Sequence, residues 1–255
     1  MKKIPNIFTL LNLLFGCCAI VFALQTESII INQADDLSTS FSVPERLYFA
    51  AICIAIAAFI DFLDGFLARL LKANSAMGKQ LDSLSDVVSF GVAPGIIIYQ
   101  FLRLSLAQEA EGLDASMLWL SPAFVLSAAA AWRLAKFNLA TDQADHFKGV
   151  PTPAVGLLIA SLPLIYWNVN EEWVRSILLN KWILIGLVAA LSFLMVSNLP
   201  MISFKFKDFS IRNNLPKYIV LLVAIIAIVI GKWLAIPVIF IAYVLVSLLF
   251  KNKIA

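Results

Sequence analysis

The segment that decides the fold is residues 46–71, which read RLYFAAICIAIAAFIDFLDGFLARLL. It is long and apolar enough to form a helix across the hydrocarbon of a bilayer, which takes about 20 residues. Two aspartates, Asp61 and Asp64, nevertheless lie inside it. Ionised side chains within membrane helices are energetically costly and mark functional sites. The segment therefore predicts a membrane protein whose function depends on carboxylates.

The composition of the whole chain agrees with a membrane protein. Of its 255 residues, 62% are hydrophobic and 14% are charged, whereas soluble domains average roughly 45–50% apolar and about 25% charged residues. Cys17, Cys18 and Cys53 lie in apolar runs without CxxC spacing, and the single histidine is His146. These residues cannot build a zinc site. The chain has no basic run with interleaved aromatic residues, so nucleic-acid binding has no support.

We expect an all-α integral membrane protein with about eight transmembrane helices. The predicted spans are 7–24, 46–71, 80–101, 117–139, 152–168, 181–198, 217–231 and 233–250. The last two are short and nearly contiguous, which predicts a tight helical hairpin, with one long buried helix as the alternative. The first span also fits a secretory signal peptide, but no convincing small-x-small cleavage site follows it.

The distribution of positive charge predicts the orientation of these spans, because cytoplasmic loops carry an excess of Lys and Arg. If the N-terminus is inside and the spans alternate, most of the 19 Lys and Arg residues fall on the inner side. The outer segments are acidic. This pattern predicts both termini in the cytoplasm.

Two further aspartates, Asp82 and Asp86, open the third predicted span. Asp61 and Asp64 are three residues apart and Asp82 and Asp86 are four apart, so each pair shares one helical face. The two helices are antiparallel in the predicted topology, so the four carboxylates converge near the cytoplasmic side. The alternative is that these charges cap helix ends or face water, which explains one aspartate better than four.

Four converging carboxylates need more positive charge than the neighbouring cations, Arg69 and Lys79, provide. Oxygen ligands suit Mg²⁺ or Mn²⁺. We therefore expect two divalent cations, which can clamp the oxygens of a phosphoryl displacement.

Eight residues within a window of 26 positions recur at the spacings of one enzyme family. They are Asp61, Asp64, Gly65, Ala68, Arg69, Gly78, Asp82 and Asp86. In this pattern the chain resembles the CDP-alcohol phosphatidyltransferases, which transfer a phosphatidyl or similar group from a CDP-linked donor to an alcohol and release CMP. The resemblance implies a catalytic bundle over residues 1–200, and we assign residues 201–255 to a basic loop and a C-terminal hairpin.

The resemblance also implies individual roles for the aspartates. Asp61, Asp64 and Asp82 would bind metal, with Asp82 bridging both ions. Asp86 would bind the second ion and act as the general base. A base near a divalent ion stays ionised at neutral pH and can take the proton of a bound alcohol.

A second set of residues is expected to contact the CDP-lipid. It consists of Gly65, Arg69, Ser75, Asn6, Thr9 and Asn12. The guanidinium of Arg69 suits a pyrophosphate, or alternatively anchors the helix at the lipid headgroups. Asn6, Thr9 and Asn12 share one helical face in a segment that also resembles the family, or they serve only to cap and join helices.

Further segments, 86–94 and 133–138 followed by 147–154, resemble the phosphatidylserine synthase branch of the family. L-serine would bring a carboxylate that needs a cation. The tentative serine-binding residues are Ser89, Arg133, Lys136 and Asn138. For Arg133 and Lys136 the alternative is anchoring at the inner membrane surface.

The expected substrates are CDP-diacylglycerol and L-serine, in an enzyme of the cytoplasmic membrane whose active site faces the cytoplasm. The family resemblance suggests a homodimer in contact with membrane lipid. One rival hypothesis is the same chemistry on glycerol 3-phosphate or inositol. Others are an intramembrane cation or proton transporter and a non-catalytic scaffold.

Overall fold

The computed structural model describes residues 4–25, 46–71, 75–109, 116–139, 147–202 and 210–251, and nearly all of these are helical. The helices of the N-terminal half are α1 (Ile4–Leu24), α2 (Arg46–Leu70), α3 (Ala76–Val87) and α4 (Ala93–Ala107). A π-helical turn, η1 (Val88–Val92), joins α3 to α4. Together they form one helical segment of 32 residues, longer at both ends than the predicted third span.

The C-terminal half begins with two short 3₁₀ turns, η3 (Met117–Trp119) and η4 (Ser121–Phe124). The helices that follow are α5 (Val125–Leu139), α6 (Thr152–Asn168), α7 (Glu172–Leu178), α8 (Lys181–Val196), α9 (Ile211–Ile226) and α10 (Ala235–Leu249). Two short strands, β1 (Phe147–Lys148) and β2 (Pro200–Met201), pair antiparallel. They tie the segment before α6 to the segment after α8.

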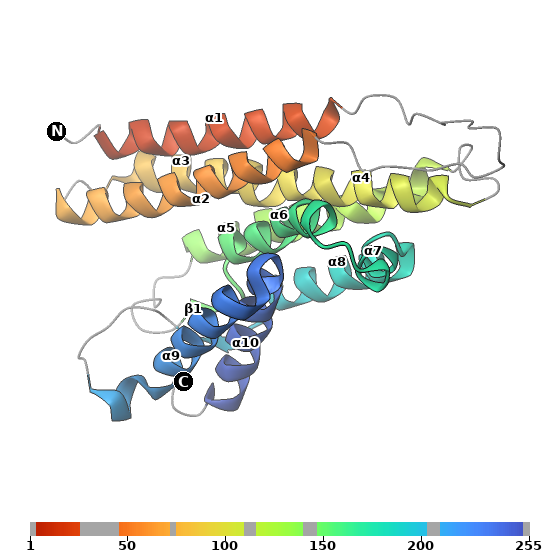
Figure 1. Ribbon diagram of the computed structural model, residues 1–255. Coiled ribbons are helices and arrows are strands. Elements are labelled where there is room, and N and C mark those ends of the chain that lie inside the picture. The colour runs from red at the N-terminus through yellow and green to blue at the C-terminus, as the bar shows by residue number, and fades with distance from the viewer. Residues whose placement is uncertain are drawn as a thin grey trace.

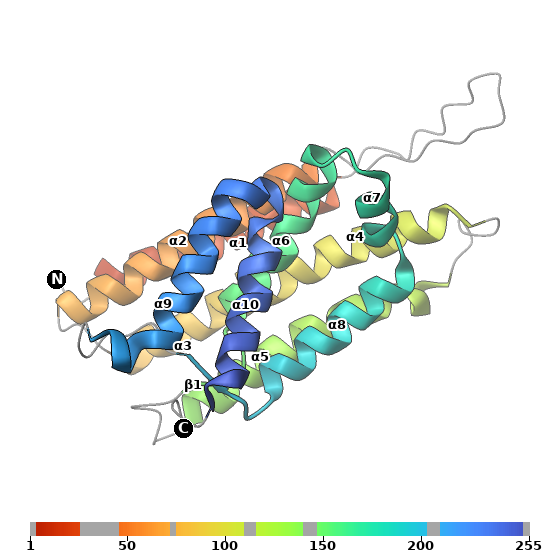
Figure 2. The same ribbon diagram turned by 60° about the horizontal axis from the view of Figure 1, so that its bottom comes forward.

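The helices pack as a bundle with an attached hairpin (Figures 1 and 2). Helix α1 packs along α2 and also contacts α3 and α4, α2 contacts α6, and α5 lies along α8. Helix α10 packs on α9, α6 and β2. The chain reverses between α9 and α10 through η5 (Ala227–Gly231) and η6 (Lys232–Leu234). The predicted hairpin is therefore confirmed, and a single long helix is excluded.

Small residues bring α1 close to its neighbours. Ala19 and Ala23 of α1 are fully buried, as are Ala50 and Ala57 of α2, and small side chains let membrane helices approach one another. At Gly16 the approach to η1 is tightest, because a Cβ there would lie 2.3 Å from the hydroxyl oxygen of Ser89. This close packing fixes α1 over the start of the α3–α4 segment.

The length and hydropathy of the helices identify a membrane protein. Among the described residues, five helical segments are long and apolar enough to cross a bilayer, or six if α7 and α8, bent by 63° at their junction, count as one span. Helix α6 is apolar but shorter. The α9–α10 hairpin lies within one of the five segments.

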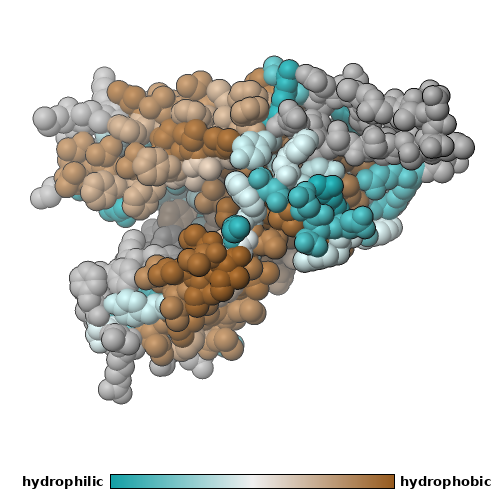
Figure 3. Space-filling view, in the orientation of Figure 1, coloured by the Kyte–Doolittle hydropathy of each residue, from teal (hydrophilic) through white to brown (hydrophobic). Residues whose placement is uncertain are grey.

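The surface agrees with this assignment. Hydrophobic side chains (brown) cover α1, α2 and the α9–α10 hairpin, whereas hydrophilic side chains (teal) gather around α7 (Figure 3). The exposed hydrophobic residues include Phe59, Phe62 and Phe66 of α2. Soluble monomers rarely expose such large contiguous apolar surfaces, so lipid is the natural solvent for this face.

Candidate active site

The site forms where the end of α2 meets the starts of α1 and α3. Asp61 and Asp64 lie on α2, and Asp64 is buried. Helix α3 begins at the cap residue Ser75, whose hydroxyl accepts a hydrogen bond from the backbone N–H of Gly78 at 2.9 Å. Because α2 and α3 follow one another and run in opposite directions, their aspartates meet at one end of the bundle.

Three of the four predicted carboxylates gather at this end. Single carboxylate oxygens of Asp61, Asp64 and Asp82 all lie within 4.8 Å of one another. Opposite ligands of a Mg²⁺ ion are about 4 Å apart, because each sits at about 2.0–2.1 Å. One oxygen of Asp64, Oδ2, is buried without a hydrogen-bond partner in the described part of the chain. An unpaired buried carboxylate oxygen is costly, so this cluster fits a divalent cation.

The fourth carboxylate, Asp86, lies one turn further along α3 and is buried. Its Oδ1 accepts a hydrogen bond from Nδ2 of Asn12 at 3.3 Å. Asp61, Asp82 and Asp64 are its acidic neighbours. Asp86 therefore adjoins the three-carboxylate cluster, with its orientation set from α1.

Helix α1 is joined to α3 by its polar residues. The hydroxyl of Ser85 donates to the backbone carbonyl of Thr9 at 3.0 Å, and the hydroxyl of Ser89 donates to that of Asn12 at 3.0 Å. Thr9 itself donates to the carbonyl of Pro5 at 3.1 Å. The side chain of Asn12 thus joins α1 to α3 through Asp86, whereas that of Thr9 bonds within α1. Thr9 also faces the cavity described next.

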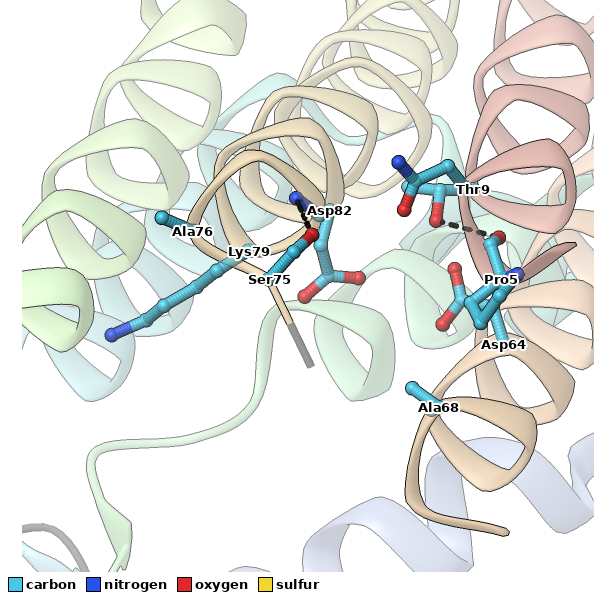
Figure 4. A pocket seen from close by; sticks show the side chains of 11 residues that line it. Pro5, Thr9, Asp64, Ala68, Ser75, Ala76, Lys79 and Asp82 are labelled. Carbon is cyan, nitrogen blue, oxygen red and sulfur yellow. Dashed lines mark hydrogen bonds between the residues drawn. The ribbon is translucent and has the colours of Figure 1, made fainter. Parts of the chain in front are cut away.

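A cavity of about 550 Å³ opens beside the carboxylates. Its lining residues are Pro5, Asn6, Thr9, Asp64, Gly65, Ala68, Ser75, Ala76, Gly78, Lys79 and Asp82. The carboxylates of Asp64 and Asp82 face each other across it, while the side chain of Lys79 points away from them (Figure 4). The volume is that of a small-molecule site.

The cavity wall offers both positive potential and space. The first turns of α1 and α3 line it, and helix N-termini bind phosphate through free N–H groups and the helix dipole. At Gly65 a Cβ would meet nothing within 4 Å. Packing therefore does not require glycine at position 65. A ligand lying against α2 would require it, because a side chain would occupy the same space.

Arg69 and Ser75, both predicted to contact the donor, differ in position. Ser75 lines the cavity. Arg69 is exposed in the last turn of α2 and is not among the described residues of the cavity wall.

The four predicted serine-binding residues do not form one cluster. Arg133 is buried in α5, 8% exposed, with Asp86 as its acidic neighbour. Lys136 is exposed and donates to Oδ1 of Asn198 at 2.6 Å. Asn138 donates to the hydroxyl of Ser83 at 2.7 Å. As the hydroxyl of Ser89 is bonded to α1, Arg133 has the strongest geometric case.

The guanidinium of Arg133 is weakly held. Its Nη1 donates to the hydroxyl of Thr152 at 3.5 Å, which is long for a hydrogen bond. Its Nε is buried and has no partner among the residues that the structure describes. A buried, under-bonded guanidinium is suited to receive a carboxylate.

Comparison with known proteins identifies the family. The family model described as CDP-alcohol phosphatidyltransferase matches residues 2–194, most of the chain. The chain belongs to the CDP-alcohol phosphatidyltransferase family. The match includes all eight signature residues and every helix that borders the cavity, and it ends before α9 and α10.

Curated relatives within this family share much of the chain. A CDP-diacylglycerol–serine O-phosphatidyltransferase of Mycobacterium tuberculosis is 30% identical over 95% of this chain and 76% of its own length. The enzyme of the same name from Helicobacter pylori is 29% identical over 86% of this chain and 78% of its own length. An archaetidylserine synthase of Methanothermobacter thermautotrophicus is 36% identical over half of this chain and 52% of its own length.

Sequence reasoning missed several residues of this CDP-alcohol phosphatidyltransferase site. Pro5 and Ala76 line the cavity, and the Ser75-x-x-Gly78 cap could have indicated a helix N-terminus there. Lys79, expected only as a cation near the carboxylates, lines it as well. No local signal paired Asn12 with Asp86, because 74 positions separate them.

Proposed function

We propose that this chain transfers the phosphatidyl group of CDP-diacylglycerol to the hydroxyl of L-serine, giving phosphatidylserine and CMP. The observation that carries the proposal is the cluster of Asp61, Asp64 and Asp82 beside a cavity walled by two helix N-termini. Family membership supports the reaction class. The serine acceptor is supported by the names of the curated relatives, which include a third CDP-diacylglycerol–serine O-phosphatidyltransferase from Bacillus subtilis.

The metal site of the proposal consists of Asp61, Asp64, Asp82 and Asp86, holding two Mg²⁺ or Mn²⁺ ions. Such ions, when bound, neutralise charge on the phosphate oxygens. The chain itself contributes the ligand geometry, through the 4.8 Å limit on the three oxygens. Asn12 fixes the rotamer of Asp86.

For the donor, we assign the phosphates to the first turns of α1 and α3, next to Asn6, Thr9 and Ser75. Gly65 leaves room for the nucleotide against α2. Arg69, exposed at the edge of the site, reaches the pyrophosphate from outside. Asn12 acts indirectly, through Asp86. The acyl chains stay in the bilayer beside the apolar face of α2.

For the acceptor, we assign the serine carboxylate to Arg133, with Lys136, Asn138 and Ser89 as weaker candidates. Asp86 takes the proton of the serine hydroxyl as its oxygen attacks the lipid-linked phosphorus. The bond from that phosphorus to the CMP oxygen breaks, and CMP leaves with the electron pair. The electrostatic interaction of Asp86 with Arg133 supports this pairing of base and carboxylate site.

We further propose that eight segments cross or enter the cytoplasmic membrane, with both termini and the cavity on the cytoplasmic side. The excess of Lys and Arg in the predicted inner segments supports this orientation. A cluster at the opposite end of the bundle supports a membrane interface there. There Lys181 lies 5.4 Å from the ring of Trp119 and 5.7 Å from that of Trp182, and it pairs with Glu109 at 2.5 Å. Tryptophan is enriched at membrane interfaces.

The division into a catalytic bundle (1–200) and a C-terminal hairpin segment (201–255) is part of the same proposal. It agrees with the end of the family match at residue 194. A homodimer rests on the family resemblance alone.

The test is CMP release by the purified protein in detergent micelles containing CDP-diacylglycerol and Mn²⁺ or Mg²⁺. We expect release that requires both the metal and serine, with labelled serine appearing in lipid. Glycerol 3-phosphate and inositol serve as competing acceptors. Faster release with either of them would refute serine as the acceptor. Metal-driven ion flux in vesicles without CMP release would favour a transporter instead.

A further inference from the structure

Helix α10, which lies beyond the family match, is hydrogen-bonded to the segment that follows α8. We call this set of bonds the grip of α10 on Ile202. Tyr243 and Ser247 of α10 are both buried. The hydroxyl of Tyr243 donates to the carbonyl of Ile202 at 3.2 Å, and the hydroxyl of Ser247 accepts from the N–H of Ile202 at 3.2 Å. Ser247 in turn donates to the carbonyl of Tyr243 at 2.7 Å. Both backbone groups of Ile202 are therefore bound by α10.

This grip extends to the start of α6. Ile202 follows β2, in which Met201 pairs with Phe147 of β1. After β1, the N–H of Gly149 donates to the carbonyl of Leu199 at 2.9 Å. Gly149 has φ +75°, and a Cβ there would lie 2.4 Å from a backbone oxygen of α8, so only glycine fits. The chain then enters α6 at Thr152, the residue that accepts from Arg133.

The start of α6 in turn sets the position of Arg133. Both Tyr243 and Arg133 are buried. In the described part of the chain, the guanidinium makes one side-chain hydrogen bond, the long one to Thr152 at 3.5 Å. Because Thr152 is the first residue of α6, the place of the guanidinium depends on where the paired strands and the bond from Tyr243 to Ile202 hold that end of the helix.

We infer that Tyr243 is a positioning residue for the acceptor: through Ile202, the paired strands and Thr152, it keeps the guanidinium of Arg133 in place to bind the carboxylate of serine. The C-terminal hairpin thereby completes the acceptor side of the site, although it lies outside the family match. The inference rests on the proposed function, because it assigns the acceptor carboxylate to Arg133.

The experiment is steady-state kinetics of the full-length Tyr243→Phe variant, which loses the hydroxyl and keeps the ring. We expect the KM for serine to rise about tenfold, which is the effect expected from the loss of one hydrogen bond. We expect kcat within about twofold of wild type and an unchanged KM for CDP-diacylglycerol, because α10 contributes none of the described residues that line the donor cavity. Tyr99→Phe, the same change in α4, is the matched control and should leave all three values unchanged.

A double-mutant cycle separates positioning from general loosening. If Tyr243 acts through Arg133, adding Tyr243→Phe to Arg133→Lys should raise the serine KM by less than about twofold further. Additive effects would overturn the inference, as would a Tyr243→Phe variant that behaves like Tyr99→Phe. Equal changes in both KM values would also overturn it, because they indicate a disturbed fold.

The two proposals can fail separately. A wild-type protein that releases no CMP with serine refutes the proposed function, and this inference with it. A wild-type protein that does so, beside an unaffected Tyr243→Phe, overturns only the inference. If Tyr243→Phe does not fold, Ser247→Ala takes its place, because it loosens the same grip on Ile202. An unchanged serine KM in that variant counts against the hairpin.

Discussion

Replacing Asp64 by asparagine should stabilise the metal-free protein and remove most of the stability that metal adds. In wild type the carboxylate oxygens of Asp61, Asp64 and Asp82 lie within 4.8 Å of one another, and two unit charges at that distance repel by about 3.5 kcal/mol at an effective dielectric constant of about 20. Without metal, proton uptake relieves part of this repulsion. In EDTA, Asp64→Asn should therefore unfold at a higher temperature than wild type.

With metal bound, wild type should instead unfold at a higher temperature than Asp64→Asn. An ion at 100 times its Kd stabilises the folded state by about 2.7 kcal/mol, which corresponds to a rise in Tm of roughly 5–10 °C for a chain of this size. Wild type should gain that amount on addition of Mn²⁺, and Asp64→Asn less than about 2 °C. The measurement is intrinsic-fluorescence melting in detergent at one scan rate, with and without Mn²⁺.

The exposed carboxylate of Glu172 on α7 provides the control, because Glu172→Gln should melt like wild type under both conditions. Equal gains from Mn²⁺ in wild type and Asp64→Asn would show that the ion binds elsewhere. That result would refute the argument from the carboxylate cluster.

Three further variants test other parts of the site. Asp86→Asn should lower kcat by about 10²–10⁴-fold, as expected for loss of a general base, with the donor KM little changed; near-normal turnover would contradict this role. Gly65→Val should leave Tm unchanged, because a Cβ there meets nothing within 4 Å, but should raise the KM for CDP-diacylglycerol. Gly16→Ala should destabilise the protein by about 1–3 kcal/mol, measured by thermal melting, because its Cβ would overlap the Ser89 hydroxyl.

The sequence predicted the fold best where a single helix carries its own signal. The predicted spans 46–71 and 117–139 nearly coincide with the segments Arg46–Leu70 and Met117–Leu139. The π-helical junction of α3 and α4 was not predicted, because hydropathy alone shows an unbroken apolar run and not its helical pitch. Hydropathy alone also does not determine the number of membrane crossings, because α6 is short and α8 is bent against α7.

The site could be predicted as far as local spacing reaches. Helical periodicity placed Asp61 with Asp64, and the antiparallel order of the spans brought Asp82 to them. Contacts between distant segments were out of reach. The path from Tyr243 through Ile202 and Thr152 to Arg133 depends on how α10 docks on α6 and β2, which no periodicity encodes. The same holds for Lys136, whose bond to Asn198 depends on the end of α8.

The π-helical turn at Val88–Val92 sets how far α4 is rotated relative to α3 about their common axis. Each α-helical residue turns the chain by about 100°, so one extra residue in a turn offsets everything beyond it by about that angle. Before the turn, Asp82 lines the cavity and Asp86 is bonded to Asn12; after it, Ile97, Ile98 and Phe101 are fully buried. The half of this membrane helix that carries the aspartates and the half that packs in the core can therefore face different directions. The pattern of residues in one half does not fix the direction that the other half faces.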